Sequence, residues 1–165
     1  MTRKLFATIL VICNLASGSI ATYAAEPHAP QPGIKLSPDL QNLLRAEMRE
    51  IAAGVQGIAV SLAGADWQAI QETSTKIRTS YIMEKKLTPA QARELEQALP
   101  ERFKQLDAEF HQRAERLGDA AAAHYAELVA FHYSRLVESC ALCHAAFAGS
   151  RFPGFSYPAQ QEHHH

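Results

Sequence analysis

The sequence lacks the sustained alternation of apolar and polar residues that marks half-buried β-strands, so no strand is expected. It also lacks an excess of charge of one sign, because 16 basic side chains stand against 17 acidic ones. That balance offers no basic stripe of the kind that binds nucleic acid. Cysteine is scarce, with three residues among 165. No second cysteine pair is therefore present to complete a structural zinc site of four ligands.

Long apolar runs are absent as well, and the N-terminal segment is typical of a signal peptide. Arg3 and Lys4 precede an apolar run over residues 5–15, and small residues lead up to a cleavage point after Ala24. That run is well short of the ~20 residues that a membrane-spanning helix needs. Residues 1–24 are therefore predicted to be removed after export to the periplasm, with no stable membrane insertion afterwards.

Export leaves a mature chain with one domain of moderate size. Cys13 departs with the signal peptide, and so do two of the 16 basic side chains, which leaves 14 against 17 acidic ones. Residues 25–36 are rich in proline and are predicted to form an extended leader. Residues 37–155 form the predicted bundle, and the polar tail 156–165, which ends in three histidines, is predicted to be disordered.

Helical periodicity and capping signals define the bundle. Ser37 and Pro38 start a first helix that ends at Gly64, and Asp66 caps a second that runs to about Glu84. The inner face of the first helix carries Leu40, Leu44, Met48, Ile51, Val55, Ile58 and Leu62. The inner face of the second carries Ile70, Ser74, Ile77 and Tyr81.

Two further long helices follow a short one that begins with a capping box at Thr88 and Gln91. The third long helix is predicted from Pro100 to a stop at Gly118, and the fourth from a cap at Asp119 to about Phe147. Phe103, Leu106, Phe110, Ala114 and Leu117 form the buried stripe of the third. The chain is therefore predicted to be all-α, an antiparallel four-helix bundle with short connections.

The segment Cys140-Ala141-Leu142-Cys143-His144 matches the attachment pattern of a c-type haem. On a helix these cysteines and the histidine share one face, so two thiols can bind the two vinyl groups of a haem while the imidazole reaches its iron. A dithiol redox motif has the same cysteine spacing, but it follows a strand at the start of a helix. Here the motif lies near the end of a long helix, which favours covalent attachment of one haem c.

The motif at the end of the last of four helices, followed by Arg151 and Phe152, resembles the class II c-type cytochromes, which comprise cytochrome c prime and its low-spin relatives. The resemblance covers about Leu36 to Phe155. Class I cytochromes c carry the motif near their start instead. The resemblance implies a monohaem protein with His144 as an axial iron ligand.

The family also implies where a sixth iron ligand belongs. Low-spin members place a methionine on the first helix, and Met48 matches that position. A methionine on an apolar stripe is otherwise usually core filler. His111 is the runner-up ligand, whereas Met83 lies at a predicted helix end and is a poorer candidate. Arg45, Glu47 and Arg49 are predicted to form a solvated face.

The other candidate haem contacts are apolar or aromatic residues on the predicted inner faces. They would lie in the core with or without a cofactor. His132 is predicted on the same helix and roughly the same face as His144, so it is not expected to bind the iron from the opposite side. The candidate cofactor-binding walls are Leu44, Phe110, Tyr133, Leu136 and Phe147.

Two functions are compatible with these features. With Met48 and His144 both on the iron, the protein is expected to carry one electron between periplasmic redox proteins, docking transiently through a mildly acidic surface. With five-coordinate iron, it would instead bind gases such as nitric oxide or carbon monoxide. Enzyme activity is not expected, because no acid–base groups adjoin Met48 on the inner face. The resemblance also allows a homodimer.

Overall fold

A computed structural model describes residues 34–155 of the chain, and this part is all-α as predicted. The predicted signal peptide, the tail and all but the last residues of the leader lie outside the described residues. Within residues 34–155 no strand is present. The elements are α1 (Pro38–Ala63), α2 (Trp67–Arg78), α3 (Met83–Lys86), α4 (Pro89–Ala98), α5 (Glu101–Ala122), α6 (Ala126–Phe147) and the 3₁₀ turn η1 (Pro153–Phe155).

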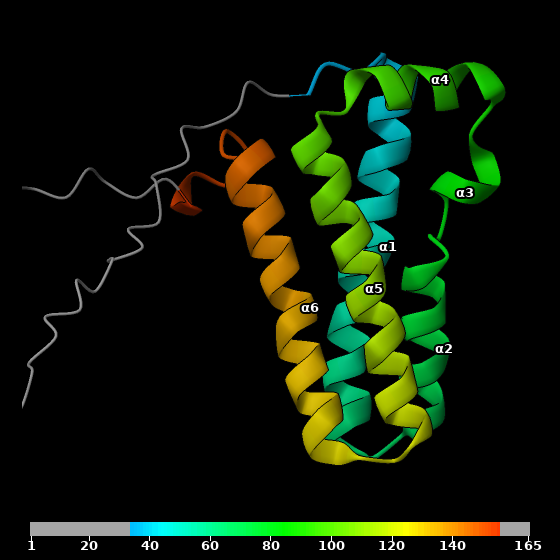
Figure 1. Cartoon of the computed structure of the whole chain (residues 1–165), viewed down its shortest axis with the longest axis vertical. Helices are drawn as coiled ribbons and strands as arrows, with labels where there is room; N and C mark the ends of the chain where they lie inside the picture. Colours follow the sequence, from blue (N-terminus) through cyan, green and yellow to red (C-terminus); the bar gives the residue numbers. More distant parts are fainter. Residues whose placement is uncertain (1–33, 156–165) are drawn as a thin grey trace, which may run out of the picture.

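Four longer helices, α1, α2, α5 and α6, lie side by side along the long axis of the molecule (Figure 1). Short links at 64–66 and 123–125 bring α2 back along α1 and α6 back along α5. The short helices α3 and α4 connect α2 to α5, and α4 lies across one end of the molecule (Figure 1). This arrangement is compatible with the predicted helical bundle.

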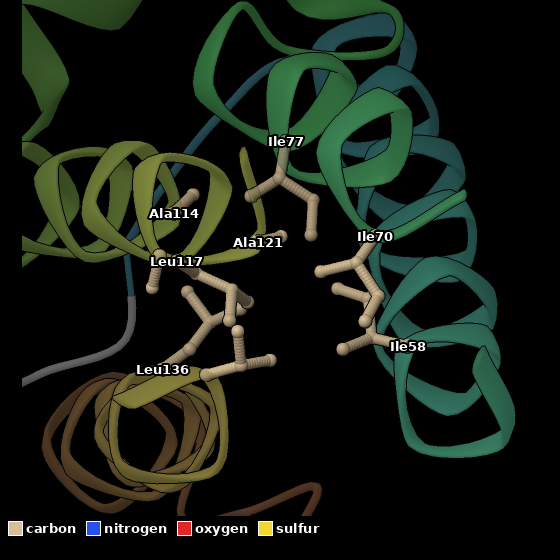
Figure 2. Close-up of a cluster of buried hydrophobic side chains, with 9 residues drawn as sticks. Ile58, Ile70, Ile77, Ala114, Leu117, Ala121 and Leu136 are labelled. Atoms are coloured by element: carbon tan, nitrogen blue, oxygen red, sulfur yellow. The ribbon is translucent and has the colours of Figure 1, made fainter. Parts of the chain in front are cut away.

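The hydrophobic core draws on all four longer helices. Figure 2 shows side chains from α1, α2, α5 and α6 converging on one another. Removing this apolar surface from water is the main favourable contribution to folding. The buried cluster consists of Ile58, Ile70, Ile77, Ala114, Leu117, Ala120, Ala121, Val129 and Leu136.

The local capping signals are largely confirmed. The Asp66 carboxylate accepts a hydrogen bond from the Ala69 N–H at 3.0 Å, and Thr88 and Gln91 form the predicted capping box. Ser37 precedes α1 as predicted, but its side chain does not cap that helix. Its hydroxyl donates to Glu94 at 2.9 Å instead, which ties the start of α1 to α4.

The prediction that the second helix continues to about Glu84 is wrong, although Tyr81 packs against the core cluster as predicted. Helix α2 ends at Arg78, and Ser80 adopts a left-handed conformation with φ of 59°. The amides of Tyr81, Ile82 and Met83 donate to the Glu47 carboxylate on α1. Because these donors are satisfied outside the helix, the chain can turn away here.

The predicted stop at Gly118 and cap at Asp119 are also wrong. Helix α5 continues to Ala122, and α6 begins only at Ala126. Glycine costs about 1 kcal/mol relative to alanine inside a helix, but the alanines that follow are the best helix formers. Ala120 and Ala121 are also buried, so packing favours continuation. The chain reverses at His124, which has a positive φ of 54°.

Candidate functional site

The cysteine motif lies in the last turns of α6, where Cys140, Cys143 and His144 are all half-buried. Both cysteines are free thiols. Residues three and four positions apart on a helix lie on the same side, so the thiols and the imidazole form one group. Leu136, one turn earlier, is fully buried and anchors this helix in the core.

Burial keeps both thiols protonated. It raises the pKa of Cys140, and together with the nearby Asp107 and Cys140 it raises the pKa of Cys143 to about 11. Dithiol oxidoreductases need the opposite, a thiol pKa lowered at a helix N-terminus. The position of the motif and the direction of both shifts therefore argue against a dithiol redox centre.

His144 is held by the segment that follows α6. The Phe152 ring stacks on the imidazole with centroids 4.5 Å apart and an interplanar angle of 12°. Burial, and secondly the charge of Arg151, lower the pKa of His144. The imidazole is therefore neutral at pH 7, which is the form that binds metals.

A cavity of about 290 Å³ lies between α1, α5 and the segment from Ser80 to Leu99. Three of the predicted site residues, Leu44, Met48 and His111, line it together. Met48 is 40 % exposed, so its thioether is not buried core filler. Met83, considered the poorer ligand, lines the same cavity because the chain turns at Ser80. The other lining residues are Glu47, Ile51, Leu87, Leu95, Leu99, Phe103 and Asp107.

His111 contacts the backbone of α2. Its Nδ1 lies 2.9 Å from the carbonyl oxygen of Ile77, and its Nε2 lies 3.7 Å from Asp107. When Nδ1 donates to the carbonyl, Nε2 is the nitrogen that carries the lone pair. This geometry gives His111 a structural contact whichever residue binds a metal.

The structure thus groups the predicted site residues into two sets, which residues of α5 connect. One set lies on α6 around Cys143 and His144, and the other lines the cavity around Met48. Phe103 connects them, because it lines the cavity and its ring contacts that of Phe147, with ring centroids 5.4 Å apart. Asp107 also connects the two sets, because it lines the cavity and its negative charge helps to raise the pKa of Cys143. Phe110 and Tyr133 pack against the core cluster, outside both sets.

Glu47 corrects the prediction of a solvated face beside Met48. Its side chain is only 3 % exposed and accepts four hydrogen bonds from residues 80–83. A signal was present in the sequence, because Leu40, Leu44, Glu47 and Ile51 recur at helical spacing. The stripe of α1 therefore contains one buried carboxylate among apolar residues.

The donor set fits a haem better than a bare metal ion. Among residues 34–155 no group of three or more His, Cys, Asp or Glu side chains is placed to hold a metal. A haem iron needs only one or two axial ligands from the protein, since the porphyrin supplies the others. Two protonated thiols, one neutral imidazole and a nearby cavity lined mainly by apolar side chains meet that requirement.

Comparisons with protein-family models, with curated proteins and with solved structures found no match to this chain. Membership of the class II c-type cytochromes therefore stays a prediction from the motif and its position. In the described part of the chain, none of the helices combines the length and apolar character required to span a bilayer.

Proposed function

We propose that this chain is an exported, periplasmic class II c-type cytochrome that carries one electron between redox proteins. Cys140 and Cys143 would hold one haem c covalently, and His144 would be an axial ligand of its iron. The observation that carries the proposal is the group of two half-buried thiols and one neutral imidazole on the last turns of α6. When bound, the haem iron supplies one-electron redox chemistry.

The residues around His144 have a defined part in this function. Phe152 fixes the plane of the imidazole by stacking on it, and Arg151 holds a positive charge close by. Both disfavour protonation of His144, Phe152 by covering the ring and Arg151 by repulsion. The histidine is therefore kept ready to bind iron at neutral pH.

Met48 is proposed as the sixth ligand. It lines the cavity together with apolar residues of α1 and α5, and its side chain is accessible from that cavity. A thioether ligand in an apolar environment raises the reduction potential relative to a second histidine. His111 is the alternative, but its contact with the Ile77 carbonyl gives it a structural role already.

Transient docking suits a carrier of this kind. The sequence carries one more acidic than basic side chain, and loss of residues 1–24 would add to that excess. Redox partners with basic patches would be attracted at low ionic strength and released as salt screens the charges.

The test is production of the full chain in a bacterium that installs c-type haem, followed by a haem stain of the denatured periplasmic protein. Covalent haem in the wild type, and none in the Cys140→Ser/Cys143→Ser variant, is the expected result. A colourless wild-type protein would refute the proposal. A high-spin spectrum with rapid binding of carbon monoxide would support the gas-binding alternative instead of electron transfer.

A further inference from the structure

Glu47 is a buried carboxylate on the stripe of α1 that otherwise consists of apolar side chains. Its side chain is 3 % exposed, and Met48 follows it directly in the chain. A carboxylate is tolerated in such a place only when hydrogen bonds replace its lost hydration. Its partners therefore indicate what it does.

Its hydrogen-bond partners are donors from one segment, residues 80–83. Oε1 accepts from the Ser80 hydroxyl at 2.9 Å and from the Tyr81 N–H at 2.8 Å. Oε2 accepts from the Ile82 N–H at 2.6 Å and from the Met83 N–H at 3.1 Å. A carboxylate from α1 thus binds the turn that separates α2 from α3.

This turn relies on Glu47 for the amides of residues 81–83, whereas the Ser80 N–H donates to the Ile77 carbonyl at 3.2 Å. Ser80 has a left-handed φ of 59°, which is uncommon for a residue with a side chain. Ile82, which precedes α3, makes no capping hydrogen bond through its side chain. The Glu47 carboxylate therefore supplies the acceptors that a capping residue would otherwise supply.

The segment so held forms one wall of the cavity that contains Met48. Ser80 and Met83 of this segment line the cavity, which residues of α1 and α5 also line. Glu47 also lines the cavity itself. One carboxylate thus connects the helix of the proposed iron ligand to a segment that lines the same cavity.

We propose that Glu47 is a positioning residue, which fixes residues 80–83 as one wall of the cavity that Met48 lines, and so would limit the access of small ligands to a haem held there. This inference rests on the proposed function for its haem-dependent part. The hydrogen bonds themselves concern the protein alone, and can be tested without a haem.

The variant Glu47→Gln is the sharpest test because it keeps the shape and removes acceptors. An amide has one acceptor oxygen, and its NH₂ group would face N–H donors of the turn. Glu50→Gln is the matched control. It lies on α1, is exposed, and also acts on Tyr81 through its charge, but the hydrogen bonds to the turn are made by Glu47.

Two measurements distinguish failure of this inference from failure of the proposed function. In the Cys140→Ser/Cys143→Ser apoprotein, Glu47→Gln should speed hydrogen exchange of the amides of residues 81–83 at least tenfold, and Glu50→Gln should not. In the haem-loaded protein, Glu47→Gln should speed binding of added imidazole or carbon monoxide several-fold, with covalent haem content unchanged.

Equal exchange in the two variants would overturn the role of Glu47, whatever the state of the haem. Faster exchange without faster ligand binding would show that the turn is held by Glu47 but does not control access, which also overturns the inference. Should Glu47→Gln fail to fold, Ser80→Ala removes one of the four donors and should give a smaller change in the same direction. An unchanged exchange rate in that variant would count against the inference.

Discussion

Phe152 lies nearly parallel to His144, with their ring centroids 4.5 Å apart and their planes inclined by 12°. The chain therefore turns back after α6 and covers the imidazole that the attachment motif supplies. Burial of this ring is the larger cause of its lowered pKa, and Arg151 is the second. The segment after α6 thus influences the protonation of the proposed ligand.

The first prediction concerns the pKa of His144 in the apoprotein, measured by NMR titration. It should lie below the ordinary value of about 6.5. Arg151→Gln should raise it part of the way, and Phe152→Ala should raise it further, since burial is the larger cause. Equal values in Arg151→Gln and wild type would show that the charge has no influence.

The free energy of unfolding should depend on protonation of the same histidine. A folded-state pKa below the unfolded one adds stability above about pH 6.5, which is lost as the pH falls through the folded-state pKa. His132, whose pKa is also lowered by burial, adds to this loss. Urea unfolding at stepwise lower pH should therefore show a smaller loss of stability in His144→Phe than in wild type.

The second prediction concerns Met48. In the haem-loaded protein, Met48→Ala should convert a low-spin spectrum to a high-spin one and lower the reduction potential, because the thioether ligand is lost. Met83→Ala is the matched control, since Met83 lines the same cavity. An unchanged spectrum in Met48→Ala would rule out Met48 as the ligand, and a change in Met83→Ala alone would transfer that role to Met83.

The third prediction concerns the reactivity of the Cys143 thiol in the wild-type apoprotein, produced in a host that does not attach c-type haem. With a pKa of about 11, Cys143 is deprotonated in only a small fraction of the molecules at pH 8, so its alkylation by iodoacetamide should be slow. It should be roughly 200-fold slower than for an unperturbed thiol of pKa about 8.5, as seen in the same protein unfolded in urea. Peptide mass spectrometry shows how much of Cys143 has been alkylated at each time. Similar rates in folded and unfolded protein would contradict the burial of Cys143.

The fourth prediction compares two glycines of α1. A Cβ at Gly54 would lie 2.3 Å from the Tyr81 hydroxyl, whereas a Cβ at Gly57 would meet nothing within 4 Å. Gly57→Ala should therefore stabilise the protein by about 0.5–1 kcal/mol through helix propensity. Gly54→Ala should destabilise it by about 1–3 kcal/mol through overpacking. Urea unfolding measures both, and an equal gain in the two variants would show that Tyr81 moves aside freely.

Helix boundaries that depend on neighbouring residues were predictable from the sequence. Asp66 and the pair Thr88 and Gln91 cap their helices through contacts within three residues. The boundaries near Ser80 and Gly118 were not predictable in this way. The first depends on a carboxylate more than 30 positions away, and the second on packing of Ala120 and Ala121 in the core.

The candidate site likewise contains some residues that local sequence predicts and others whose positions depend on distant parts of the chain. The cysteine motif is local, so the grouping of its two thiols and one imidazole on one side of a helix could be predicted from spacing alone. Periodicity predicted Met48 on the buried inner face of α1, but Met48 is 40 % exposed, although it lines the cavity. The position of Met83 beside the same cavity was not predicted, because it depends on the turn at Ser80. Glu47 lies at stripe spacing, but its charge led to the opposite prediction.

Half-burial of the two thiols bears on whether the proposed haem attachment would precede or follow folding. Once α6 has packed against α5, Cys140 and Cys143 are protonated and partly covered, so a large planar reactant meets them less readily than in the extended chain. Covalent attachment at these sulfurs would therefore come before the bundle closes. Molecules that fold too early would be trapped without their cofactor, and haem added later would not rescue them.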